Sequence, residues 1–117
     1  MERVVITGMG LVTPSGIGTE ETWRSVLAAE SGVAPITLFD ASGFSTRFAG
    51  EVKGFNAEDW IPKKKIKEMG RFAHLSVAAS MLAMKDSGIE LTDAVVPGYW
   101  EVRGYDVDGF IGRSNGY

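Results

Sequence analysis

Residues 3–16 read RVVITGMGLVTPSG, and this stretch decides how the rest of the chain is interpreted. Its first part, residues 4–6, is a run of β-branched side chains, which is typical of a strand buried on both faces. Four glycines then follow around Pro14: Gly8, Gly10, Gly16 and Gly18. Glycine and proline at this density indicate a loop, so we predict a buried strand that leads into a glycine-rich loop.

The glycine-rich loop is followed by a predicted helix over residues 20–30. Thr19 stands at the expected N-cap, and Glu20 and Glu21 place negative charge in the first turn, where the helix dipole favours it. Apolar residues then recur at helical spacing, and Gly32 lies just beyond the expected end as a stop signal.

A second and longer helix is predicted over residues 71–87, ended by Gly88. Its polar side chains between Phe72 and Met84 are limited to His74, Ser76 and Ser80. A helix of this composition has little surface for solvent. We therefore expect it to be largely buried against other layers of a body larger than this chain.

The region between the two helices carries weaker signals. We expect residues 35–46 to be irregular and residues 47–53 to form a weak strand. Asn56 is expected to cap a short turn of helix that runs through Trp60, and Pro62 suits the first position of a further helix.

The composition is that of an ordinary soluble protein of 117 residues, with 44% hydrophobic and 23% charged residues and a net charge of −3. This acidic balance disfavours nucleic-acid binding. The chain contains no cysteine, which excludes disulfides and thiolate chemistry. No apolar run approaches the ~20 residues needed to cross a bilayer, and the N-terminus lacks the apolar stretch of a signal peptide. We therefore expect a cytoplasmic protein that binds neither nucleic acid nor membrane.

The glycine-rich loop invites comparison with the dinucleotide-binding fingerprint G-x-G-x-x-G. Gly8 and Gly10 supply its first half, but Thr13 stands where the third glycine belongs and Pro14 follows. A tight structural turn explains the loop better than a nucleotide site.

Two further patterns that suggest ligand sites also have structural explanations. His74 is the single histidine of the chain, and on a mostly apolar helix it is expected to be a structural residue with one hydrogen-bond partner. Residues 106–109, DVDG, hint at a calcium loop, but an EF-hand would require different residues at Phe110, Ile111 and Tyr117. No metal or cofactor is expected.

Several short motifs, taken in order, resemble the opening of the β-ketoacyl-acyl-carrier-protein synthases II, condensing enzymes of fatty-acid synthesis. Residues 3–16 resemble the family's R-V-V-[IV]-T-G-[ML]-G and T-P-[LV]-G, with Ser15 at a place that is usually apolar. The later motifs are ETW at 21–23, LAA and SG within 27–32, FD at 39–40, FAGEVKGF at 48–55 and SG at 87–88. Together they identify the chain as similar to this family over roughly its first 90 residues.

This resemblance implies an α/β chain that is the N-terminal fragment of a thiolase-like layered α-β-α-β-α fold. Residues 1–94 would be the N-terminal part of a synthase domain. Residues 95–117 would be a divergent tail that is rich in glycine and aromatic residues and holds a distorted form of the family's next strand and glycine turn. A truncated gene, a reading-frame error and a genuine short protein are all compatible with this tail.

The resemblance also implies a reaction, the decarboxylative condensation of malonyl-carrier with acyl-carrier in fatty-acid or polyketide elongation. The family works through a cysteine nucleophile and two histidines. This chain has no cysteine, and His74 matches neither catalytic histidine. We therefore assign no catalytic, cofactor-binding or metal-binding residue and expect no activity from the chain alone. The alternative is a non-catalytic module that binds acyl carrier protein or pairs with a synthase.

A basic cluster precedes the second helix. Lys63, Lys64 and Lys67 fall where related synthases carry basic residues that dock acyl carrier protein, a strongly acidic partner, although Glu68 replaces an expected basic neighbour. A solvated face without a partner is the competing interpretation. The resemblance further suggests a homodimer or pairing with a full-length synthase.

Overall fold

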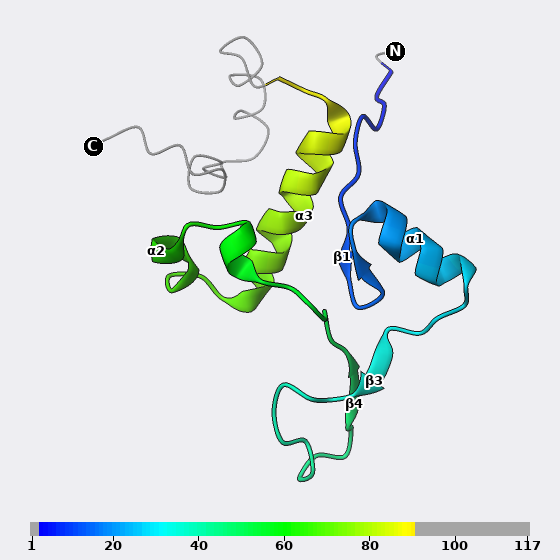
Figure 1. Cartoon of the computed structure of the whole chain (residues 1–117), viewed down its shortest axis with the longest axis vertical. Coiled ribbons are helices and arrows are strands. Elements are labelled where there is room, and N and C mark those ends of the chain that lie inside the picture. The colour runs from blue at the N-terminus through cyan, green and yellow to red at the C-terminus, as the bar shows by residue number, and fades with distance from the viewer. Residues whose placement is uncertain (1–2, 91–117) are drawn as a thin grey trace.

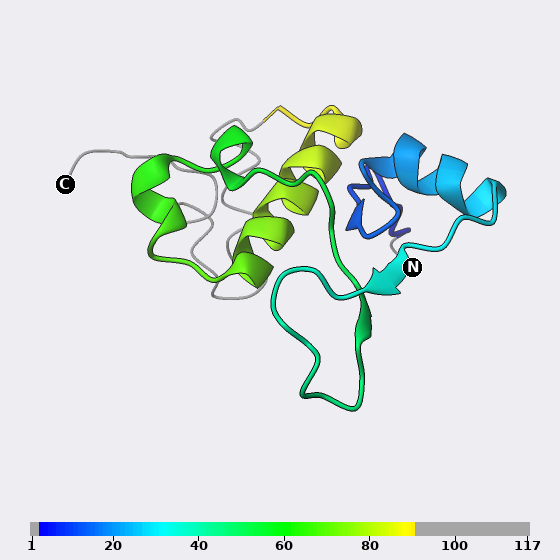
Figure 2. The same cartoon turned by 60° about the horizontal axis from the view of Figure 1, so that its bottom comes forward.

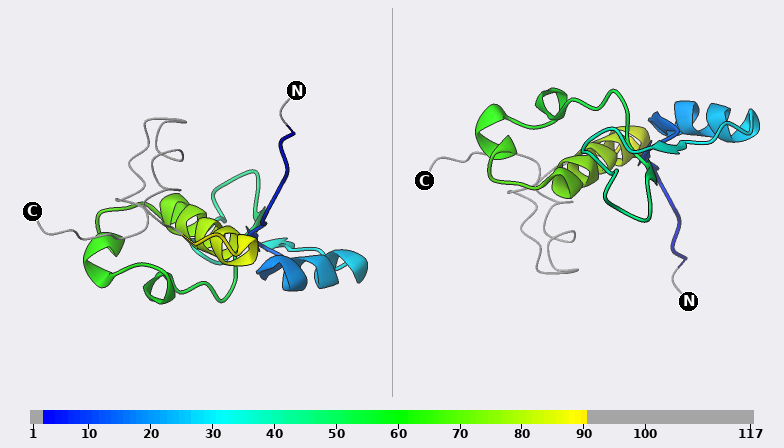
Figure 3. Two further views of the ribbon diagram at one scale, coloured as in Figure 1. Left: turned by 90° about the horizontal axis from the view of Figure 1, so that it is seen from above. Right: turned by 90° about the horizontal axis from the view of Figure 1, so that it is seen from below.

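The computed structural model describes residues 3–90 of the 117 (Figure 1). In chain order the elements are β1 (Val12–Thr13), β2 (Gly16–Ile17), α1 (Thr19–Leu27), β3 (Val33–Pro35), β4 (Phe48–Gly50), the 3-10 helix η1 (Ala57–Asp59), α2 (Lys63–Ile66) and α3 (Arg71–Ser87). α3 lies between α1 on one side and the segment carrying η1 and α2 on the other (Figure 3). None of the helices within residues 3–90 is long and apolar enough to span a membrane.

The strands form two antiparallel pairs. β1 and β2 pair with Val12 opposite Ile17, and β3 and β4 pair with Ala34 opposite Ala49. A long loop over residues 36–47 joins β3 to β4 and projects away from the helices (Figure 2). The weak strand expected over residues 47–53 is therefore confirmed in a shorter form, because only three of its residues have a partner.

The predicted strand over residues 4–6 is wrong for the part of the chain that the structure describes. Residues 3–11 have no regular secondary structure, and the side chains of Val4 and Ile6 are 94% and 85% exposed. A β-branched run becomes a strand only where a neighbouring strand supplies hydrogen bonds and a surface to pack on. No strand within residues 3–90 pairs with this segment, so its preference is not realised.

Gly8 and Gly10 allow close packing against α3. A Cβ atom built on either glycine would collide with the backbone of α3 at Ala83. Between them, the amide of Met9 donates a hydrogen bond of 2.8 Å to the carboxylate of Asp86. The backbone of this segment therefore lies directly against the helix, at a separation that only glycine permits.

The turn predicted in the glycine-rich loop is confirmed a few residues later, where β1 and β2 enclose Pro14 and Ser15. Pro14 packs against the β3–β4 pair: a Cβ atom on Gly50 would lie 2.8 Å from Pro14 Cγ, and one on Gly32 would lie 2.7 Å from Pro14 Cβ. Glycine at these positions thus allows the β1–β2 turn to pack closely against the β3–β4 pair.

The start of α1 differs from the prediction by one residue. Gly18 occupies the N-cap, with φ 106° and ψ 156°, and no side chain caps the helix there. Thr19 is the first helical residue, and its hydroxyl donates instead to the carbonyl of Met9 at 3.5 Å. The acidic first turn is confirmed, and Glu21 also accepts a hydrogen bond from the amide of Ile17 at 3.2 Å.

The end of α1 was predicted too late, and Gly32 is not its stop. The helix closes in a Schellman motif, in which the amide of Glu30 donates to the carbonyl of Ser25 at 2.9 Å and that of Ala29 to Val26 at 3.1 Å. Ala29 has φ 54°, a left-handed conformation that usually requires glycine. Local hydrogen bonding therefore ends the helix five residues before Gly32.

The short helices follow the sequence closely. Asn56 caps η1 as predicted, with its side chain accepting a hydrogen bond from the amide of Glu58. Pro62 is displaced by one position from the expectation, because it is the N-cap of α2 and not its first helical residue.

The bounds of α3 are confirmed: it spans Arg71–Ser87 and ends at Gly88, which is left-handed with φ 64°. The expectation of an enclosed helix is not met within residues 3–90, where Val77 and Ala78 are its fully buried residues and Phe72 remains 78% exposed. The described segments cover only part of the helix surface: the glycine segment packs along it, and the segment before it contacts its first turns through Arg71 and His74.

Candidate functional site

The basic cluster forms a single helical turn, α2, that stands beside α3. Its backbone is closed by hydrogen bonds from the amides of Lys65 and Ile66 to the carbonyl of Pro62, at 2.8 and 3.3 Å. We call residues 63–67 the basic turn; it contains Lys63, Lys64, Lys65 and Lys67. The lysine side chains of this turn are exposed, so they are accessible to a partner.

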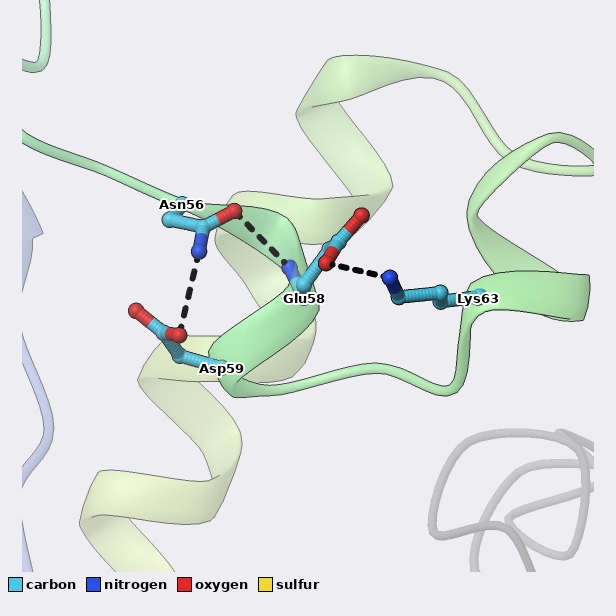
Figure 4. A network of polar contacts seen from close by, with 4 residues as sticks. All are labelled: Asn56, Glu58, Asp59 and Lys63. Carbon is cyan, nitrogen blue, oxygen red and sulfur yellow. Dashed lines mark hydrogen bonds and ion pairs between the residues drawn. The ribbon is translucent and has the colours of Figure 1, made fainter.

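Lys63 is tied to the preceding element, η1. Its ammonium group lies 3.1 Å from the carboxylate of Glu58 (Figure 4). Asn56 holds η1 in place by accepting from the amide of Glu58 at 3.2 Å and donating to the carboxylate of Asp59 at 3.1 Å. This network links the beginning of the basic turn to η1.

A second ion pair joins Lys65 to Glu68, at 3.2 Å. Within residues 3–90, Lys64 and Lys67 are the lysines of the basic turn that have no carboxylate within ion-pairing distance. Exposed ion pairs contribute little to stability and exchange readily. Lys64 and Lys67 are therefore the cations of this turn whose charge no described carboxylate offsets in this structure.

Acidic residues next to the basic turn reduce the net positive charge of this surface. Residues 56–68 contain four lysines and three acidic residues, so their net positive charge is small. Such a surface attracts an acidic partner mainly through the placement of individual cations and only weakly through its overall field. The geometry of Lys64 and Lys67 therefore matters more than the lysine count.

Two side chains of α3 connect this region to the rest of the molecule. His74 Nε2 lies 3.1 Å from the carbonyl oxygen of Ile66, at the end of α2, and the histidine is half-buried. Arg71 donates to the carbonyl of Val52 at 3.1 Å and lies over the ring of Phe55, 5.8 Å from its centre. The single hydrogen-bond partner expected for His74 is confirmed, whereas the role of Arg71 was not predicted.

One feature of the sequence indicates that Arg71 needs a partner: its guanidinium group lies in the first turn of a helix. A cation there is unfavourable for the helix dipole, and an external partner is one way to offset that cost. The partner itself lies 19 residues away in the sequence and could not be read from it.

Across residues 3–90, no three side chains of the metal-ligating types are close enough to hold an ion. The hydrogen bond of His74 within the described residues goes to a backbone carbonyl and not to a nucleophile. The rejected calcium pattern at residues 106–109 lies outside the described residues, as does the tail over 95–117.

One carboxylate outside the basic turn has a perturbed environment. Glu51 accepts hydrogen bonds from the hydroxyl of Thr37 at 2.7 Å and from the amides of Thr37 and Leu38 at 3.1 Å. These donors, led by the Thr37 side chain, hold the pKa of Glu51 below its ordinary value. The carboxylate fastens the start of the 36–47 loop to the end of β4.

Comparison with known proteins agrees with the fold described above. Residues 1–115 match the family model described as "Beta-ketoacyl synthase, N-terminal domain". A solved structure, the ishigamide ketosynthase/chain length factor, superposes with a TM-score of 0.67 and 38% identity over 74% of this chain and 21% of that chain. The predicted fold class, an N-terminal fragment of a thiolase-like α/β fold, is thereby confirmed.

Curated relatives carry the name 3-oxoacyl-[acyl-carrier-protein] synthase 2. The protein of Vibrio cholerae is 45% identical over 91 residues, which cover 78% of this chain and 22% of that synthase. The protein of Synechocystis is 40% identical over 92 residues, covering 79% and 22%. The chain thus spans about a fifth of the length of the relatives it matches.

The family match is longer than the synthase part predicted over residues 1–94, whereas the two pairwise alignments cover 91 and 92 residues. The boundary at residue 94 lies outside the described residues and stays a prediction. The family itself is settled by these matches: the chain belongs to the β-ketoacyl synthases.

Proposed function

We propose that this chain is the N-terminal scaffold of a β-ketoacyl-acyl-carrier-protein synthase II-like protein of fatty-acid or polyketide elongation. The observation that supports this most directly is the 45% identity with a 3-oxoacyl-[acyl-carrier-protein] synthase 2 over 91 residues. Residues 1–94 would supply this scaffold, and residues 95–117 would form a separate tail.

The residues of the chain fit a supporting role in that reaction. Condensation requires an activated nucleophile to hold the acyl group and donors to stabilise the developing oxyanion. The chain has no cysteine and one histidine, which bonds to a backbone carbonyl. Its contribution would be α3 and the glycine segment packed against it, around which the reacting parts of a synthase assemble.

A hybrid enzyme tests the scaffold role. Residues 1–90 would replace the matching first part of the Vibrio cholerae synthase 2, which supplies the rest of the body. We expect the hybrid to elongate acyl-carrier substrates, because the shared motifs preserve the packing of α3. A correctly folded hybrid without activity would contradict the proposal.

A matched variant of the hybrid shows whether the packing described above is used. Gly10→Val adds side-chain atoms where the backbone of α3 lies, so this hybrid should lose folding or activity. Gly43→Val is the control, because nothing lies within 4 Å of a Cβ atom at Gly43.

We further propose that Lys63, Lys64 and Lys67 dock acyl carrier protein. The names of the relatives, 3-oxoacyl-[acyl-carrier-protein] synthase 2, refer to an acyl carrier protein. In the present structure Lys64 and Lys67 have no carboxylate partner within residues 3–90, while Lys63 is shared with Glu58. Docking would therefore rest chiefly on Lys64 and Lys67.

Reversing the charge of these three lysines to glutamate tests the docking surface. Binding to an acidic acyl carrier protein should weaken at low salt, and the loss should shrink as the Debye length falls from about 30 Å at 0.01 M to about 3 Å at 1 M salt. The matched control reverses three exposed basic residues elsewhere, Arg24, Lys53 and Lys85, and changes the net charge equally. If both triple variants lost binding equally, the affinity for acyl carrier protein would depend on net charge alone and not on these three lysines.

The second candidate function is a non-catalytic module that binds acyl carrier protein or pairs with a synthase, including a second copy of itself. It is favoured by the same exposed lysines, which need no active site to act. Carrier binding by the full chain combined with an inactive hybrid would support this module over the scaffold. Sedimentation of the chain with and without a full-length synthase would report the homodimer or the pairing.

A further inference from the structure

The basic turn is too short to hold its own shape. α2 contains four residues, and isolated helices of this length do not form in water because nucleation is unfavourable. The last carbonyl groups of any helix also lack partners within the helix. Contacts from outside α2 must therefore set the direction in which its lysines point.

At its beginning, the basic turn is held by the ion pair between Lys63 and Glu58. Both side chains are exposed, 79% and 50% respectively, and exposed ion pairs are weak and sensitive to salt. This ion pair therefore holds the side chain of Lys63 only loosely. A second contact lies at the other end of the turn.

At its end, the basic turn is held by His74. A carbonyl oxygen only accepts hydrogen bonds, so Nε2 of His74 carries the proton and donates to Ile66 across 3.1 Å. The same carbonyl receives a longer contact of 3.4 Å from the amide of Met69. The histidine belongs to α3 and is half-buried, so this bond fastens the turn to the longest element of the fold.

The anchored residue stands between the two lysines without carboxylate partners. Lys67 follows Ile66 directly, and Lys64 precedes it by two positions in the same turn. When the carbonyl of Ile66 is fixed, the backbone on both sides of it is fixed in direction. The spacing between the two cations and their orientation relative to α3 are set by the same bond.

We propose that His74 is a positioning residue that orients Lys64 and Lys67 toward an acidic protein partner. This inference rests on the carrier docking proposed above. It adds the side chain that fixes the orientation of the docking lysines. Without the bond, the turn would sample several orientations, and the apparent affinity would fall with the fraction of molecules in the binding orientation.

Two similar substitutions test the hydrogen bond itself. In His74→Gln the side-chain amide nitrogen reaches the place of Nε2 and donates to Ile66, whereas in His74→Asn the side chain is one methylene shorter and does not reach it. We expect His74→Asn to weaken binding of the full chain to acyl carrier protein at low salt by about two- to tenfold, the range of one hydrogen bond. His74→Gln should bind within about twofold of the unchanged chain.

Ser80→Ala is the matched control on the same helix. The hydroxyl of Ser80 is exposed and bonds to the carbonyl of Ser76, away from the basic turn. Its removal should leave carrier binding unchanged. Equal affinity of the Asn and Gln variants, whether high or low, would overturn the proposal, because the hydrogen bond would then not be the property that matters.

A double-mutant cycle separates positioning from a general loss of structure. Lys64→Glu with Lys67→Glu should cost much less affinity in the His74→Asn chain than in the unchanged chain, because their cations are already misplaced. Additive losses would overturn the positioning role. The cycle also distinguishes the two proposals: if the lysine reversal has no effect in the unchanged chain, docking itself fails, and if only the coupling is absent, the role of His74 fails while docking stands.

Discussion

At the scale of single residues, Ala29 shows how a local motif is completed by a residue that suits it poorly. It occupies the left-handed position of the Schellman motif that ends α1, with φ 54°. Glycine is the residue that usually occupies this left-handed position after a helix. The left-handed conformation costs an L-residue about 1–2 kcal/mol relative to the right-handed one.

We therefore expect Ala29→Gly to stabilise the fold by about 0.5–1 kcal/mol, because part of the gain is offset by the greater freedom of glycine in the unfolded chain. Denaturant titration of the two proteins measures this difference. Ala28→Gly is the control, since Ala28 is right-handed with φ −79° and should lose stability on the same change. A loss of stability in both variants would show that the left-handed strain is absent.

Glu51 gives a prediction about pH at the same scale. Its folded-state pKa lies below the ordinary value because the Thr37 hydroxyl and the Leu38 amide donate to the carboxylate. A lowered pKa stabilises the fold at pH values above the unfolded pKa of about 4.3, and this contribution disappears as the pH falls through the folded pKa. Acidification from pH 5 to pH 3 should therefore loosen the β3–β4 loop.

Amide exchange at Thr37 and Leu38 checks this expectation. Exchange corrected for its intrinsic pH dependence should rise on acidification in the unchanged chain and be high at all pH values in Glu51→Ala. Asp40, whose pKa is also lowered by the amide and hydroxyl of Ser42, lies in the same loop and serves as the control. If the Asp40→Ala chain lost the pH response at Thr37, the response would come from Asp40 and not from Glu51, and the prediction would be wrong.

At the scale of secondary-structure elements, α3 begins without a side-chain cap. Gly70 stands at its N-cap in an extended conformation, φ −75° and ψ 160°, which an aspartate adopts without strain. Gly70→Asp should stabilise the fold by a few tenths to about 1 kcal/mol, because a carboxylate there accepts backbone amides and faces the positive end of the helix. Chemical denaturation reports the change.

An added Cβ atom at Gly70 would approach the ring of Phe72 to 3.0 Å, but this ring is 78% exposed and has room to move. Gly70→Asn separates the two contributions, since it provides the same acceptor without the charge. A neutral or destabilising result for both variants would mean that Phe72 cannot move aside.

The elements that the sequence predicted well are those whose signals are local. Gly88 and the apolar period defined α3 to the residue, and Asn56 identified the cap of η1, because each signal acts within one turn of the chain. The pairing of β3 with β4 could not be predicted, since it joins residues 13 to 17 positions apart and the turn residues of the long loop between them do not set a register. The strand predicted over residues 4–6 was wrong because it also depended on a distant partner: these residues have strand composition but no partner strand within residues 3–90.

The candidate site shows the same division. The lysines of the basic turn and the structural character of His74 were evident from the sequence. The ion pairs were not, because Lys63 pairs with Glu58 across two elements and Lys65 pairs with Glu68 through the direction of its side chain. Composition therefore located the basic surface, and only the structure showed which of its cations have no carboxylate partner within residues 3–90.

At the scale of the whole molecule, residues 3–90 expose more apolar surface than a stable monomer usually shows. The exposed large side chains come from every part of the described chain and include Val4, Ile6, Trp23, Leu27, Phe48 and Phe72. We expect the isolated chain to be marginally stable and to self-associate as its concentration rises. Analytical ultracentrifugation and thermal melts across a concentration series check this, and a sharp reversible melt of a monomer would contradict it.

The chain alone should also be inactive in condensation. It has no cysteine to form a thioester, and its single histidine cannot form a two-histidine site. Purified chain should release no CO2 from malonyl-carrier protein, show no covalent acyl adduct by mass spectrometry and take up no thiol-directed inhibitor. Release of CO2 above background from a preparation free of host synthase would refute this expectation.

The contact between the glycine segment and α3 has a consequence for synthesis on the ribosome. Gly8 and Gly10 meet a helix roughly 70 residues later in the chain, so their docking surface does not exist when they emerge. At typical translation rates the delay is about 4–15 s, far longer than a helix or hairpin needs to form. During that interval the backbone at Gly8 and Gly10 has no helix to pack against and is available to chaperones or to other nascent chains. The glycine segment is therefore synthesised well before the surface on which it packs.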